Sequence, residues 1–160
     1  MSLGKLGVWA ATDGFSATDA ATFAQRVEAW GYGALWLPEG VGREVLVASS
    51  WLLAQTRTLT IASGIANIYA RDAMTATAAN NTLNEQSGGR FVLGLGVSHV
   101  PLVEGVRKLE YGKPIATMRA YLEAMAAAPY MAPPPSVKPR TVVAALGPKM
   151  LELAAEKTDG

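Results

Sequence analysis

The stretch LTIASGIANIYARDA, residues 59–73, begins as an apolar strand and then presents polar groups within a few positions. A strand that is apolar along nearly its whole length is typical of a parallel sheet covered on both faces. Gly64, Asn67 and Arg71 follow this strand, and polar side chains at a buried strand end need solvent, a ligand or a partner. The segment therefore predicts a buried parallel strand whose carboxyl end carries candidate functional groups.

Comparable strand-like runs recur along the chain. They cover residues 6–10, 34–39, 90–97 and 141–146. Five helical patterns lie between or after these strands. The first runs from a Ser16 cap to Gly31 and the third from an Asp72 cap to Gly88. The second covers 43–55 and should be mostly buried, the fourth covers 113–127, and the fifth begins at Pro148. This alternation predicts an α/β fold with a parallel sheet, in a single domain over residues 1–160. The proline-rich stretch 128–140 is predicted to be an extended surface connection.

Composition excludes several classes of protein. The chain has 160 residues, 14 Lys and Arg against 13 Asp and Glu, and no cysteine. Without a basic excess, nucleic acid is not an expected partner, and without cysteine there can be no disulfide, thiolate metal site or cysteine nucleophile. The apolar runs are shorter than the ~18 residues of a membrane span, and Lys5 interrupts any secretory leader pattern. We expect a cytoplasmic protein with no membrane partner.

The carboxyl ends of parallel strands are where ligands gather, so the polar residues there are the candidates. Glu39 could serve a ligand, or form a salt bridge or helix cap. Asn67 could contact a ligand, or satisfy backbone groups of its own loop. Arg71 could pair with an anionic group, or be a solvated loop charge. Gly147–Pro148, where the last helix begins, could offer backbone N–H groups to an anion or be only a turn.

His99 is the only histidine of the chain. Its ordinary pKa allows proton exchange near neutral pH, so it is a candidate catalytic residue together with Glu39, although it could equally be an ordinary loop histidine. One histidine without cysteine or an acidic cluster cannot make a usual zinc site, and no metal is expected. The G-x-G at 94–96 lacks the third glycine of the dinucleotide fingerprint, which excludes a standard NAD site.

Four blocks together resemble the luciferase-like monooxygenase family, and most closely its branch that uses the deazaflavin coenzyme F420. The blocks are WLPEG (36–40), SGIANIYAR (63–71), GRFVLGLGVS (89–98) and AALGPKMLELAAEKTDG (144–160). The resemblance implies a TIM-type (β/α)₈ barrel with F420, or alternatively FMN, across its carboxyl-terminal rim. It also implies a bulge with a cis peptide at Gly64–Ile65 behind the cofactor ring. The cofactor-binding residues that it implies are Glu39, Gly64, Ile65, Asn67, Val97, Ser98, Ala145, Leu146, Gly147 and Pro148.

The implied activity is hydride transfer between the cofactor and a small organic substrate. In several relatives a histidine follows the acidic residue that matches Glu39, whereas this chain has Gly40.

A TIM barrel takes about 250 residues. About five βα units therefore predict a partial barrel, either a piece of a longer enzyme or a form protected by association. Exposed edges of the first and last strands favour a dimer. The alternatives are a non-catalytic remnant that binds flavin or a partner, and a flat Rossmann-type half with another ligand.

Overall fold

A computed structural model describes residues 3–160, so the first two residues of the predicted domain lie outside the described part. The strands are β1 (Gly7–Trp9), β2 (Ala34–Leu37), β3 (Thr60–Ser63), β4 (Ala66–Asn67), β5 (Phe91–Gly96) and β6 (Arg140–Val143). The helices are α1 (Ala17–Ala29), α2 (Val45–Gln55), α3 (Ala73–Ser87), α4 (Pro114–Ala127) and α5 (Pro148–Lys157), with a π-helix, η1, at Pro101–Val106.

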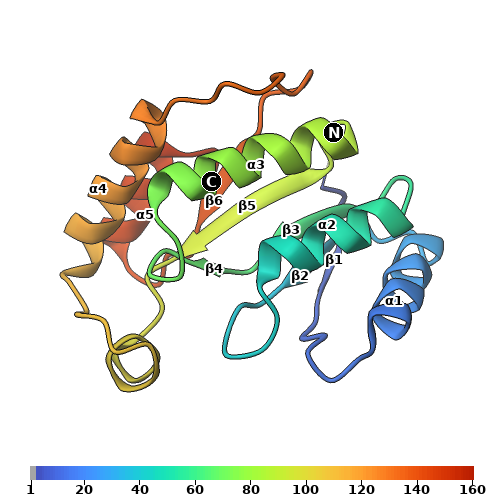
Figure 1. The fold of residues 1–160 in the computed structure, drawn as a ribbon, viewed down its shortest axis with the longest axis horizontal. Coiled ribbons are helices and arrows are strands. Elements are labelled where there is room, and N and C mark those ends of the chain that lie inside the picture. The colour runs from blue at the N-terminus through green and yellow to red at the C-terminus, as the bar shows by residue number, and fades with distance from the viewer. Residues whose placement is uncertain (1–2) are drawn as a thin grey trace.

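Every strand pair in the sheet is parallel, which confirms the predicted α/β class. The strand order is β1-β2-β3-β5, and β4 and β6 also pair with β5 (Figure 1). Because Leu95 is paired with both β4 and β6, these two strands lie on opposite sides of β5. Parallel strands need a crossover between them, and α1, α2 and α3 supply the crossovers of the first half.

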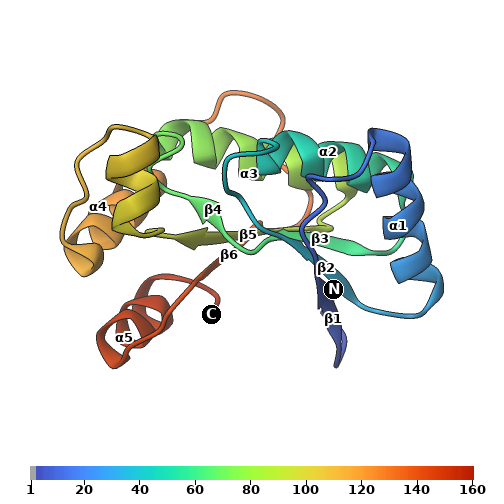
Figure 2. The same cartoon turned by 90° about the horizontal axis from the view of Figure 1, so that it is seen from below.

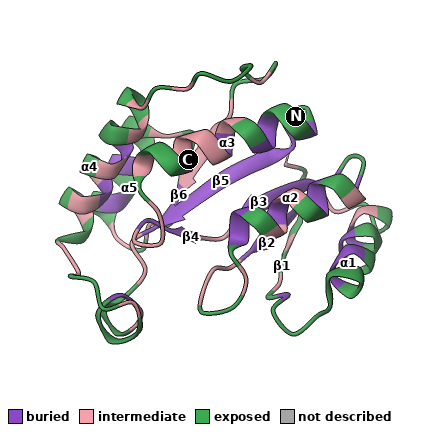
Figure 3. Cartoon of the chain, in the orientation of Figure 1, coloured by how far each residue is buried: buried purple, intermediate pink, exposed green. Residues whose placement is uncertain are grey.

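The helices α1, α2 and α3 lie along one face of the sheet, whereas β1 and α5 extend toward the other side (Figure 2). The pairing register aligns Leu35, Ile61 and Phe91 in a row on the helix side, where all three are fully buried. Burying one such side chain contributes about 1.5–3 kcal/mol. β3 and β5 are buried along their whole length (Figure 3), as nearly continuous apolar strands predict.

The opposite face of the sheet carries two tryptophans, Trp9 and Trp36, which are paired in the register. Each indole lies against a glycine. A Cβ atom on Gly7 would lie 3.2 Å from Nε1 of Trp36, and one on Gly64 would lie 3.3 Å from Cδ1 of Trp9. The two glycines therefore leave room for the indoles.

The helix ends follow the sequence closely. Ser16 Oγ accepts a hydrogen bond from Asp19 N at 3.1 Å, and Asp72 Oδ1 accepts one from Thr75 N at 2.9 Å. Gly88 ends α3 in the left-handed conformation, with φ of 64°. The predicted caps of α1 and α3, and the predicted start of α5 at Pro148, are confirmed.

Several predicted boundaries are wrong. The run 59–66 is two strands, because regular pairing stops after Ser63, and the run 141–146 is a strand only from Arg140 to Val143. The prediction that 43–55 is mostly buried fails for Val47 and Trp51, which are exposed on the outer side of α2. The π-helix η1 was not predicted, and residues 128–139 form neither helix nor regular strand and are mostly exposed.

The outer edge of β6 is partly paired, contrary to the open edge that we expected. Thr141 N donates to Asp159 Oδ2 at 2.9 Å, and Asp159 N donates to Thr141 O at 2.8 Å. Val143 N donates to Gly160 O at 2.9 Å. Residues 159–160 thus lie along β6 in the manner of a further strand.

Candidate active site

The bulge between β3 and β4 is built by one serine and one glycine. Ser63 Oγ donates to Gly94 O at 2.8 Å and accepts from Gly94 N at 2.9 Å, so a side chain replaces the backbone pairing that is lost here. A Cβ atom on residue 94 would lie 2.0 Å from Ser63 O, so only glycine fits. The Gly64–Ile65 peptide that follows is cis, at the position that the family resemblance implies.

Glu39 and Arg71 form a buried ion pair at the ends of β2 and β4. Glu39 Oε2 accepts from Arg71 Nη1 at 3.1 Å and from Asn67 N at 2.7 Å, while Oε1 pairs with Arg71 Nη2. The side chains are 3% and 7% exposed, and Arg71 also pairs with Glu44 at the start of α2. Burial opposes the charged form of Arg71, but the two carboxylates outweigh it and raise its pKa. Arg71 is therefore not a solvated loop charge, and the salt-bridge alternative describes Glu39.

Asn67 is fully buried in β4. Its Oδ1 accepts from Tyr69 N at 3.0 Å, which satisfies a backbone group of its own loop, and its Nδ2 has no partner within residues 3–160. Through its side chain, Asn67 thus stabilises the loop that follows β4. Its contribution to the rim is its backbone N–H, which donates to Glu39.

Tyr111, which sequence patterns did not reveal, packs beside the segment that follows β5. Ser98 has a left-handed φ of 57°, and its carbonyl accepts from Tyr111 Oη at 3.2 Å. The ring of Tyr111 stacks on Tyr69 with 5.6 Å between centroids, and Tyr69 Oη accepts from Gly112 N at 2.9 Å. Burial and then the neighbouring Tyr69 raise the pKa of Tyr111, so its phenol stays neutral at physiological pH.

A cavity of about 850 Å³ opens at the carboxyl ends of the strands. Its lining includes eight of the predicted site residues, which come from four separate segments: Glu39, Ile65, Val97, Ser98, His99, Leu146, Gly147 and Pro148. The lining does not include Gly64, Asn67 or Ala145. It adds residues that the sequence analysis missed, including Tyr111, Ile115 and Lys149. Of these, only Lys149 carried a signal, since it follows the candidate anion-binding turn.

The cavity suits a flat, mostly apolar molecule with an anionic end. Its volume is within the roughly 300–1,000 Å³ of ordinary ligand sites, and its walls are mainly apolar. Gly147 begins α5 without a side-chain cap. Pro148 has no N–H, and Met150 N and Leu151 N donate to Gly147 O, so the N–H groups of Gly147 and Lys149 and the positive end of the helix dipole are what this turn offers an anion. Within residues 3–160 we find no cluster of three histidine, aspartate or glutamate side chains that could hold a metal, and no helix there is long and apolar enough to cross a membrane.

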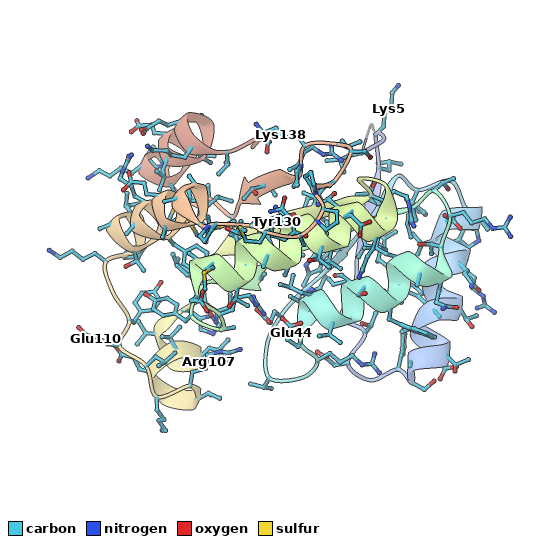
Figure 4. All side chains as sticks on the ribbon, turned by 45° about the horizontal axis from the view of Figure 1, so that its top comes forward. Lys5, Glu44, Arg107, Glu110, Tyr130 and Lys138 are labelled. Carbon is cyan, nitrogen blue, oxygen red and sulfur yellow. The ribbon has the colours of Figure 1, made fainter. Side chains whose placement is uncertain are left out.

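A second cavity, of about 790 Å³, lies between α2 and α3 on the helix side of the sheet. Glu44 and Arg107 line it, from the start of α2 and from the segment after η1 (Figure 4). Glu39 lines both cavities and Arg71 lines this one, so the ion pair forms the partition between them.

Comparison with solved structures places the fold. An F420-dependent secondary alcohol dehydrogenase, in complex with an F420-acetone adduct, matches with a TM-score of 0.83 and 15% identity over 96% of this chain and 56% of that chain. A type II Baeyer–Villiger monooxygenase of Pseudomonas putida, in complex with FMN, matches with a TM-score of 0.72 and 14% identity. The match covers 86% of this chain and 50% of that chain. The predicted partial TIM-type barrel is confirmed.

Sequence comparison gives the family. A protein of Mycobacterium tuberculosis, provisionally assigned as a coenzyme F420-dependent oxidoreductase, is 30% identical over 124 residues, which cover 77% of this chain and 35% of that protein. The chain spans between about a third and about half of the length of the curated relatives that it matches. The model of the luciferase-like monooxygenase family matches residues 1–160. The chain belongs to the luciferase-like monooxygenase family.

Proposed function

We propose that this chain carries the cofactor site of an oxidoreductase that uses F420, or alternatively FMN, to transfer a hydride to or from a small organic substrate. The observation that carries the proposal is the strand-end cavity, which gathers Glu39, Ile65, the segment 97–99 and the turn 146–148. The names of the relatives support the choice of cofactor, since they include F420-dependent oxidoreductases and an FMN complex.

The residues of the cavity have distinct roles in this proposal. A bound F420 or FMN supplies two-electron chemistry, for which the protein provides placement and exclusion of water. Ile65 and Val97 are the apolar walls, and Lys149 with the start of α5 holds the anionic end. Glu39 borders the cavity as a positioned carboxyl group, because Arg71 and the backbone N–H of Asn67 both donate to its oxygens. His99, exposed at the mouth, is the group that exchanges a proton.

We further propose that the protein acts in the cytoplasm. We also propose that it acts as a dimer, because β1 lies at the open end of the strand order. The second candidate function is a non-catalytic remnant that binds flavin or a partner. The observation that favours it is the engagement of Glu39, a candidate catalytic group, whose carboxylate oxygens already accept from Arg71 and from Asn67 N.

The test is a titration with F420 and with FMN, followed by absorbance, in the oxidised and reduced forms. A matched pair of variants locates the site: Leu146→Glu places an anion at the cavity, whereas Leu151→Glu places one on the exposed outer side of α5. Leu146→Glu is expected to weaken binding roughly tenfold through repulsion of the anionic end, and Leu151→Glu to change it little.

The outcomes separate the candidates. Binding with oxidation of the reduced cofactor by an organic acceptor supports the enzyme, and binding without turnover of any acceptor supports the remnant. Absence of binding for both cofactors refutes the enzyme and the flavin-binding form of the remnant. Equal weakening by the two variants refutes the placement of the cofactor in this cavity.

A further inference from the structure

Trp9 is an exposed aromatic surface beside the wall of the strand-end cavity. Its Nε1 donates to Gly64 O at 2.8 Å, and its ring lies against the Cα of the same glycine. Ile65, the next residue, lines the cavity. The indole nevertheless remains 62% exposed, on the face of the sheet away from α1, α2 and α3.

The only polar atom of the indole is already used. Because Gly64 O accepts from Nε1, the part of Trp9 that remains open to a ligand is its apolar ring. The hydrogen bond also fixes the ring orientation, so a molecule that stacks on the ring meets a surface already in place. Preorganisation of this kind lowers the entropic cost of binding.

The charged side chains in the loops after β1 and β2 are all engaged within the protein. Asp13 Oδ1 accepts from Arg43 N at 2.8 Å, and the guanidinium of Arg43 donates to backbone carbonyls of the first loop. Glu39 and Glu44 both pair with Arg71. This half of the rim, next to Trp9, therefore offers no loop cation to a phosphate or carboxylate.

The other half of the rim differs. Lys149 and the uncapped start of α5 lie at the β6 side of the cavity. Arg107, whose Nε finds no partner within the described residues, lines the helix-side cavity and not this face. The rim therefore has two different sides. The side near β6 carries the cation Lys149, and the side near β1 carries the Trp9 ring beside charged groups that are already paired within the protein.

We propose that Trp9 forms the substrate-binding surface of the site, and that the substrate is a neutral, apolar, unsaturated compound such as an aromatic or conjugated ketone. The inference rests on the proposed function, which assigns the β6 side to the anionic cofactor. Stacking on the indole selects flat apolar molecules, and the lack of a free loop cation excludes anionic ones from this half of the rim.

The test observes the indole N–H resonances of the protein while acetophenone or phenyl phosphate is added, with and without bound cofactor. Trp9→Phe assigns the Trp9 resonance and keeps an aromatic ring, and Trp9→Ala removes the ring. Trp30, exposed where α1 ends, is the reference indole, with Trp30→Phe as its matched variant.

Acetophenone is expected to shift the Trp9 resonance saturably and to leave Trp30 unmoved. Trp9→Ala should weaken this binding roughly fivefold and raise the KM of a turned-over ketone with little change in kcat, while Trp9→Phe should retain most of the affinity. The proposal is overturned if phenyl phosphate shifts Trp9 as strongly as acetophenone, or if Trp30 responds equally. A protein that shows the Trp9 response but binds neither F420 nor FMN refutes the proposed function and not the surface.

Discussion

The Glu39–Arg71 ion pair should be the most costly polar contact of the site to break. Arg71→Ala removes the guanidinium and leaves the carboxylate of Glu39 inside the protein, with one backbone N–H as its remaining partner. At 3% exposure, Glu39 cannot recover the lost interaction from solvent. Breaking a buried pair in this way costs about 3–5 kcal/mol, because one buried charge is left uncompensated.

The expected loss is large beside a typical domain stability of about 5–15 kcal/mol. The second partner of Arg71, Glu44, has a side chain that is 44% exposed, so its share of the loss is small. Arg119 is the matched control, since its guanidinium donates two hydrogen bonds of 3.0 Å to the Glu156 carboxylate at the surface. Solvent screens that pair, so Arg119→Ala should change stability far less.

Urea unfolding followed by circular dichroism measures both variants against the unchanged chain. Glu39→Gln and the double variant Glu39→Gln/Arg71→Ala complete a double-mutant cycle with Arg71→Ala. We expect the double variant to recover part of the Arg71→Ala loss, because no charge then stays buried without a partner. The reasoning is refuted if Arg71→Ala loses less than about 1 kcal/mol, or no more than Arg119→Ala.

Three further outcomes are expected. Gly94→Ala should destabilise the fold by about 3 kcal/mol or more in denaturant unfolding, because its Cβ would lie 2.0 Å from Ser63 O, whereas Gly14→Ala enters open space and should be near neutral. Burial opposes the charged form of Glu28, but hydrogen bonds from three backbone N–H groups outweigh it and lower its pKa below 4.5, so stability should fall as pH drops through that lower value, and Glu28→Gln should flatten the slope. Burial raises the pKa of Tyr121 to about 12, so its stabilisation should persist below pH 10 and be lost as pH rises toward 12, which tyrosinate absorbance and a Tyr121→Phe comparison will measure.

The sequence predicted what depends on short-range chemistry. The Ser16 and Asp72 caps and the start of α5 follow from side chains within three or four residues, and they are as expected. The apolar strands at 90–97 and 59–66 indicated a parallel sheet for a comparable reason, since burial on both faces is visible in composition alone.

What the sequence could not predict depends on pairs far apart in the chain. Ser63 and Gly94 are 31 positions apart, and Glu39 and Arg71 are 32 apart, so neither the serine-bridged bulge nor the buried ion pair has a local pattern. The π-helix has the same composition as an ordinary loop or helix turn, and only backbone geometry reveals it.

The contacts that shape the bulge and the ion pair beside the cavity lie between Glu39 and Tyr121. Ser63 bridges to Gly94, Tyr69 stacks on Tyr111, and Tyr121 Oη donates to the carbonyl of Arg71 at 3.1 Å, which ties α4 to the loop that supplies the ion pair. None of these contacts requires a strand beyond β6. These contacts therefore hold this part of the rim in place, whereas the exposed Trp9 lies on β1, at the end of the strand order, where β2 is the one paired neighbour among the described strands.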